Sequence, residues 1–191
     1  MKRKYILIIL VAVAVILILT KLGYDFYLDH QSSGIIANVI ARKHYSVTQA
    51  DQSIELDLFI KPEWIPFDSN TPKELNVLLK ETHNTKIILR EVWNRGDDIY
   101  FSFTTRYNLN FKKGEFLYNM ILNESGTTTS NGTYHQIKLF DLNQVSVDHR
   151  GVGFGPNSDF SFGIDPDQQL RIKNGFYVRY TGMFLYGYSR E

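Results

Sequence analysis

Cysteine is absent from this 191-residue chain. The chain therefore cannot form disulfides, carry a lipid on a processed cysteine, or use a thiol as a nucleophile or a zinc ligand. Small domains in oxidising compartments often depend on disulfides for stability. A domain without them needs a hydrophobic core that is sufficient by itself, and this chain is long enough for one such core.

An excess of positive charge is also lacking. The chain has 21 Lys and Arg residues, three of which precede residue 5, against 20 Asp and Glu residues. Proteins that bind nucleic acid usually present a basic field to the phosphates. The near balance of charge after residue 5 therefore argues against a nucleic-acid partner.

Motifs for catalysis or ligand binding are scarce. The sequence contains no Gly-x-Ser-x-Gly nucleophile motif, and its five histidines form no His-x-His or His-x-x-x-His pair that would indicate a zinc site. Glycines alternate between Asp148 and Asn157, but a strand pattern follows them instead of the helix that a phosphate loop requires. We expect neither a metal nor a cofactor.

What the sequence does contain is an uncharged apolar run from Tyr5 to Thr20, preceded by Lys2-Arg3-Lys4. As a helix, this run extends about 24 Å, whereas the hydrocarbon core of a bilayer is about 30 Å thick. The helix becomes long enough to cross this core if Lys21 extends its ammonium group toward the interface and the following aromatic residues continue the helix to Leu28. Residues 5–28 are therefore predicted to be a transmembrane helix.

A cleaved signal peptide is the main alternative, and a buried helix of a soluble domain is another. Signal peptides end at a small-x-small cleavage site. The clear match, Ala12-Val13-Ala14, lies inside the apolar run, where cleavage would come too early. We therefore favour an uncleaved signal-anchor.

The charges that flank the run predict its orientation. Three cations precede it, whereas Lys21 on the far side is opposed by Asp25 and Asp29, so the positive-inside rule places the N-terminus in the cytoplasm. The predicted organisation is a cytoplasmic basic tip (1–4), the transmembrane segment (5–28), a stalk or first helix (29–52) and an extracytoplasmic β-rich domain (53–191).

Two short helices are predicted after the apolar run. Apolar residues recur at helical spacing in 35–44, and Thr71-Pro72-Lys73-Glu74 has the pattern of a helix start, which predicts a helix over 72–81. The rest of the chain is predicted to be strands separated by short turns. These strands are residues 54–60, 86–93, 99–107, 115–122, 134–140, 145–147, 160–164, 170–172 and 176–188.

This succession predicts a mainly β fold, an antiparallel two-layer sandwich of general immunoglobulin-like form with one or two short helices. The alternative is an α+β roll in which the helices fill the concave face of a curved antiparallel sheet. The glycine-rich segment 148–159 is predicted to be a long irregular connection between strands.

Aromatic residues are concentrated near the C-terminus, beyond what one face of a strand must bury. Tyrosine and arginine are enriched at binding surfaces because they combine a large rigid area with a polar tip. We predict a binding surface for a protein or glycan partner outside the cell, formed by Tyr177, Arg179, Tyr180, Tyr186 and Tyr188.

Asp148 and His149 are weak catalytic candidates, since a carboxylate beside an imidazole can orient it as a general base. Neighbouring residues of a strand point to opposite faces, however, so the pair needs a turned backbone to cooperate. The favoured function is a non-catalytic binding or structural role at the cell envelope. An envelope hydrolase that uses His149 with neighbouring carboxylates is the alternative.

Overall fold

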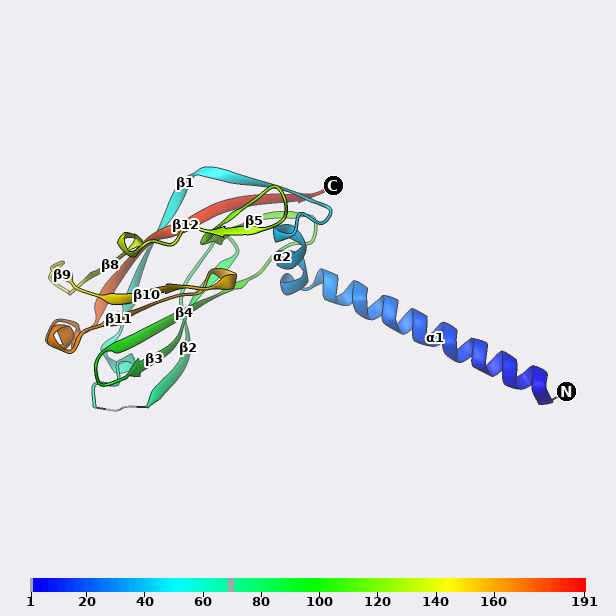
Figure 1. Cartoon of the computed structure of the whole chain (residues 1–191), viewed down its shortest axis with the longest axis horizontal. Coiled ribbons are helices and arrows are strands. Elements are labelled where there is room, and N and C mark those ends of the chain that lie inside the picture. The colour runs from blue at the N-terminus through cyan, green and yellow to red at the C-terminus, as the bar shows by residue number, and fades with distance from the viewer. Residues whose placement is uncertain (1, 69–70) are drawn as a thin grey trace.

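A computed structural model describes residues 2–68 and 71–191 (Figure 1). The chain begins with a single long helix, α1 (Lys2–His30), that projects from one end of a β-rich domain. Within α1, Leu10–His30 is long and apolar enough to cross a membrane, and the domain buries none of it. A signal sequence near the N-terminus meets the same criterion.

A second helix, α2 (Ser32–Ile40), follows directly, so the helix predicted over 35–44 is confirmed as far as Ile40 and residues 41–44 form a turn. Its buried face joins Ile35 and Val39 to the domain. The Leu109 amide donates a hydrogen bond to the Ser32 hydroxyl at 3.1 Å. The His30 ring stacks on Phe111, with 3.6 Å between ring centroids. These contacts fasten the end of α1 to the domain without a flexible linker.

The domain consists of two large antiparallel sheets and one small one, which confirms the predicted fold class. The first sheet has the order β1 (Tyr45–Ile60), β12 (Phe176–Arg190), β8 (Ile137–Phe140) and β9 (Ser146–Val147), and β5 (Lys113–Tyr118) also pairs with β12. The second sheet has the order β10 (Arg150–Phe154), β11 (Phe160–Ile164), β4 (Ile99–Tyr107), β3 (Thr85–Asn94) and β2 (Pro72–Thr82). The small sheet pairs β6 (Met120–Leu122) with β7 (Thr128–Ser130).

Short helical segments connect the strands. They are η1 (Pro62–Trp64), η2 (Tyr134–Gln136), η3 (Pro156–Ser158), η4 (Pro166–Gln168) and α3 (Gln169–Ile172).

The core lies between the two large sheets and is built from alternate residues of each strand. Phe101 of the second sheet meets Phe176 of the first in an edge-to-face contact with centroids 5.2 Å apart, and Phe160 stacks on Tyr180 at 4.5 Å. All four side chains are at most 2% exposed. Burial of aromatic surface of this size is the main stabilising term available to a domain without disulfides.

The predicted helix over 72–81 is wrong: these residues belong to strand β2. Register shifts interrupt the pairing of β2 with β3 between Glu74 and Val77 and again between Leu78 and Lys80. Each irregularity breaks the two-residue alternation of the strand. As a result, the leucines at 75, 78 and 79 have the i, i+3, i+4 spacing that is typical of one face of a helix. Pairing with β3 through a tight turn outweighs the local helix-start signal.

The predictions for four other segments differ from the structure as well. Residues 134–136, predicted as the start of a strand, form η2, and the strand begins at Ile137. Residues 170–172 lie in α3 rather than in a strand, and the glycine-rich segment 148–159 includes strand β10. Strand β1 begins at Tyr45, within the range 29–52 assigned to a stalk or first helix. Its pairing with the end of β12, Tyr45 opposite Arg190, extends the first sheet toward α1.

Candidate functional site

Strand β12 separates the predicted binding residues into two groups. The side chains of Tyr180, Tyr186 and Tyr188 are at most 4% exposed, so these three residues belong to the core and not to a surface. The Tyr186 hydroxyl accepts a hydrogen bond from the Leu122 amide, and the Tyr188 hydroxyl donates one to the Asn110 carbonyl at 2.6 Å. Burial raises the pKa of Tyr188 to about 12 and also raises the pKa of Tyr180.

Tyr177 and Arg179 are half-buried and lie on the face of β12 opposite to Val178 and Tyr180, which pack in the core between the two large sheets. In the first sheet, Tyr177 is paired with Phe59 of β1 on one side and Phe140 of β8 on the other. The Phe59 and Tyr177 rings are 5.0 Å apart, and Phe59 is 36% exposed. The three rings therefore form a row across three strands on the outer face of the sheet.

Arg179 is held in place beside this aromatic row. Its guanidinium carbon lies 4.6 Å from the centre of the Phe140 ring, and Nη2 donates to Gln144 Oε1 at 3.0 Å. Its Nε is 3.9 Å from the carboxylate of Asp57. An arginine stacked and bonded in this way loses less side-chain entropy when it binds a ligand than a free one would.

The turn between β8 and β9 and the short helix α3 (orange in Figure 1) lie at the end of the domain opposite α1, and each carries an exposed leucine. Leu142, in the turn after β8, is 47% exposed, and Leu170 of α3 is 77% exposed. Both line one hollow of about 560 Å³, together with Asp141, Asn143, Arg171 and Asn174. We name Phe59, Tyr177, Arg179, Leu142 and Leu170 together the distal surface.

No protein-family model, curated protein or solved structure matches this chain. The functional interpretation therefore depends on the geometry of the chain itself. Sequence analysis missed Phe59, Leu142 and Leu170. A signal existed for Phe59, because it occupies an outward position in an alternating strand, where Glu55 and Asp57 precede it. The leucines lie in a turn and a short helix, and no periodic pattern marks such positions.

The catalytic candidates Asp148 and His149 point in different directions, as expected for neighbours in an extended segment. Asp148 is exposed, whereas His149 is buried and its Nε2–H donates to the Ile137 carbonyl at 2.8 Å. The imidazole stacks on Tyr134 at 4.3 Å, and its buried Nδ1 has no hydrogen-bond partner within the described part of the chain. The Asp165 carboxylate forms an ion pair with Arg150, with 2.7 Å between Oδ1 and Nε. His149 thus has the surroundings of a packed side chain and lacks the carboxylate that would orient a base.

His149 should make the stability of the domain depend on pH. Its pKa lies below the ordinary value of 6.5, mainly because burial disfavours the charged ring. The unfolded chain therefore binds a proton more readily, and the free energy of unfolding should fall as pH drops below about 6.5. Urea titrations between pH 7.5 and 5 should show a smaller decrease for His149→Phe than for the natural chain. An identical pH dependence in both would contradict this assignment.

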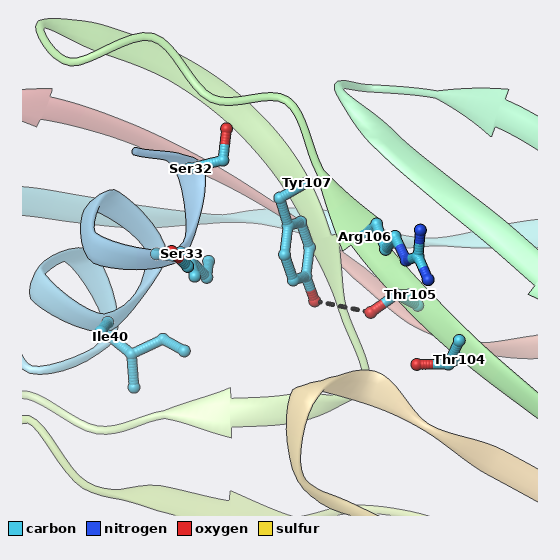
Figure 2. A pocket seen from close by; sticks show the side chains of 9 residues that line it. Ser32, Ser33, Ile40, Thr104, Thr105, Arg106 and Tyr107 are labelled. Atoms are coloured by element: carbon cyan, nitrogen blue, oxygen red, sulfur yellow. Dashed lines mark hydrogen bonds between the residues drawn. The ribbon is translucent and has the colours of Figure 1, made fainter. Parts of the chain in front are cut away.

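A second cavity, of about 460 Å³, lies between α2 and β4 (Figure 2). Ile36, Ala37 and Ile40 of α2 line one side and Thr104–Tyr107 of β4 the other. The Tyr107 hydroxyl accepts a hydrogen bond from Thr105 at 3.1 Å and donates one to Ser158 at 3.3 Å. Within residues 2–68 and 71–191, no group of three or more His, Asp or Glu side chains gathers where it would hold a metal.

Proposed function

We propose that this chain is a membrane-anchored protein with a non-catalytic binding role outside the cytoplasm, and that the distal surface is where it binds a protein partner. In this proposal α1 spans the membrane and remains part of the mature protein. The β-sandwich then presents the distal surface away from the bilayer.

The observation that carries the proposal is the gathering of exposed apolar and aromatic side chains with a fixed arginine at one end of the domain. Phe59, Leu142 and Leu170 are each at least 36% exposed, and clusters of exposed large apolar residues are typical of interaction sites. Aromatic residues and arginine are enriched in protein interfaces. The leucines favour a protein partner over a glycan, because sugar rings stack on aromatic faces and gain little from aliphatic side chains.

The contacts between the end of α1 and the domain support a role in which position matters. Asn38 of α2 donates a hydrogen bond to the Asp29 carboxylate at 3.3 Å, in addition to the stacking of His30 on Phe111. The domain therefore has a defined orientation relative to α1. A partner would meet the distal surface at a nearly constant height above the membrane.

Labelling of single cysteines tests the proposed topology, and the natural chain provides a cysteine-free background. In intact cells, a membrane-impermeant maleimide should label Asn143→Cys, which lies in the exposed turn after β8. Lys2→Cys should react only after the cells are permeabilised. Labelling of Lys2→Cys but not of Asn143→Cys in intact cells would reverse the orientation and contradict the proposal.

A further inference from the structure

Positive side chains gather at the opposite end of the domain, where α1 joins it. Lys43 precedes β1, Lys112 and Lys113 lie at the start of β5, and Arg190 ends β12. All four are exposed. They come from three segments that are far apart in the sequence, so sequence analysis did not connect them. We name these four residues the cationic collar.

Backbone hydrogen bonds join the three segments of the collar. The Arg190 amide donates to the Lys112 carbonyl at 2.8 Å, and the Glu191 amide donates to the His44 carbonyl at 3.1 Å. In Figure 1 the C-terminus lies at the same end of the domain as α1. The collar is therefore part of the folded framework, not a set of independent tails.

Phe111 links the collar to α1. The Arg190 guanidinium lies 4.1 Å from the centre of the Phe111 ring, and the same ring stacks on His30, the last residue of α1, at 3.6 Å. If α1 crosses a membrane, as proposed above, Phe111 lies beside the end of α1 that emerges from the membrane. The collar then faces the lipid headgroups.

The cations of the collar are not held in ion pairs with carboxylates of the described residues. Among the acidic residues close to these segments, Glu115 is bound to His83 at 2.7 Å, and Glu124 follows Asn123, whose carbonyl accepts a hydrogen bond from Arg42 beside Lys43. Asp29 accepts a hydrogen bond from Asn38, and the four cations remain exposed to an external anion.

We infer that the cationic collar binds the headgroups of anionic phospholipids in the leaflet next to the domain. Each Lys or Arg close to an anionic bilayer surface adds to the attraction, which falls off within roughly one Debye length, about 10 Å. Arg190, stacked on Phe111, offers a fixed guanidinium that can engage a phosphate with two parallel hydrogen bonds. The inference rests on α1 spanning the membrane but not on the distal surface.

Energy transfer to labelled lipids tests the inference with the full chain. A donor dye is attached at His44→Cys, within the collar region, and the protein is reconstituted in vesicles of phosphatidylcholine and phosphatidylglycerol. A trace acceptor is carried on the headgroup of either lipid. Transfer to labelled phosphatidylglycerol should exceed transfer to labelled phosphatidylcholine by about twofold at low salt, and high salt should remove the difference.

Two triple variants separate a local effect from net charge. In the first, Lys43→Gln, Lys112→Gln and Lys113→Gln, the preference for phosphatidylglycerol should disappear. In the second, Lys80→Gln, Lys138→Gln and Lys173→Gln, the same charge is removed elsewhere on the domain and the preference should remain. Equal transfer to both lipids in the natural chain, or equal loss in both variants, overturns the inference. If no energy is transferred to either labelled lipid, both the membrane anchoring by α1 and the lipid contact of the collar are overturned.

Discussion

Leu170→Asp is expected to weaken retention of the protein partner by tenfold or more. Leu170 is the most exposed large apolar side chain of the β-rich domain, and it lines the hollow that it shares with Leu142. A carboxylate placed in an interface core loses its hydration without gaining a partner. A tenfold change corresponds to about 1.4 kcal/mol, which is modest for truncation of a central interface residue.

The measurement is quantitative mass spectrometry of proteins that copurify with the tagged chain from detergent-solubilised membranes. Leu78→Asp is the matched control, because Leu78 is 50% exposed on β2, outside the distal surface. Tyr177→Ala should reproduce the loss seen with Leu170→Asp. Equal retention by the two leucine variants, or no protein specific to the natural chain, would contradict a protein-binding role. Recovery of a polysaccharide instead would indicate a glycan ligand.

The second large effect concerns stability. Phe162→Ala is expected to lower the free energy of unfolding by about 3–5 kcal/mol, because it removes a fully buried aromatic ring and leaves a cavity. Phe162 is 0% exposed and packs on Phe101 and Phe103, with ring centroids 5.3 and 5.6 Å away. Losses of this size are a large part of the stability of a typical domain.

Urea unfolding of the full chain, followed by tryptophan fluorescence, measures this loss. Leu170→Ala provides the comparison, since that side chain is 77% exposed and its truncation should change the free energy of unfolding by less than about 0.5 kcal/mol. A loss below about 1 kcal/mol for Phe162→Ala would mean that the two sheets do not pack around this ring.

The parts of the fold that follow from local pattern were predictable. The segment from β3 to β4 is an example: apolar alternation ends at Asn94, a turn containing Gly96 follows, and alternation resumes at Ile99. Strand β2 was not predictable, because two register shifts disguise its alternation. Here the pairing with β3 decides the structure, and the sequence of β2 alone does not reveal that pairing.

The candidate site was predictable only in part. Tyr177 and Arg179 alternate with Val178 and Tyr180, which face the core between the two large sheets, so strand periodicity separates Tyr180 from the outward pair. A register shift between Tyr180 and Met183 then reverses the alternation: Met183 and Leu185 face that core, whereas Tyr186 and Tyr188 are buried in a second cluster with Ile35 and Val39 of α2. Their burial depends on the packing of α2 against the first sheet, which periodicity alone does not reveal. Contacts across the sheets, such as the row through Phe59 and Phe140, depend on strand order, and one sequence does not specify strand order.

Both proposals require that α1 stays attached to the domain and crosses the membrane. The intact mass of the mature protein, measured after alkaline carbonate extraction of native membranes, tests it most directly. We expect a membrane-retained chain whose mass includes residues 5–28. A mature chain that begins beyond residue 30 and is released by carbonate would contradict it.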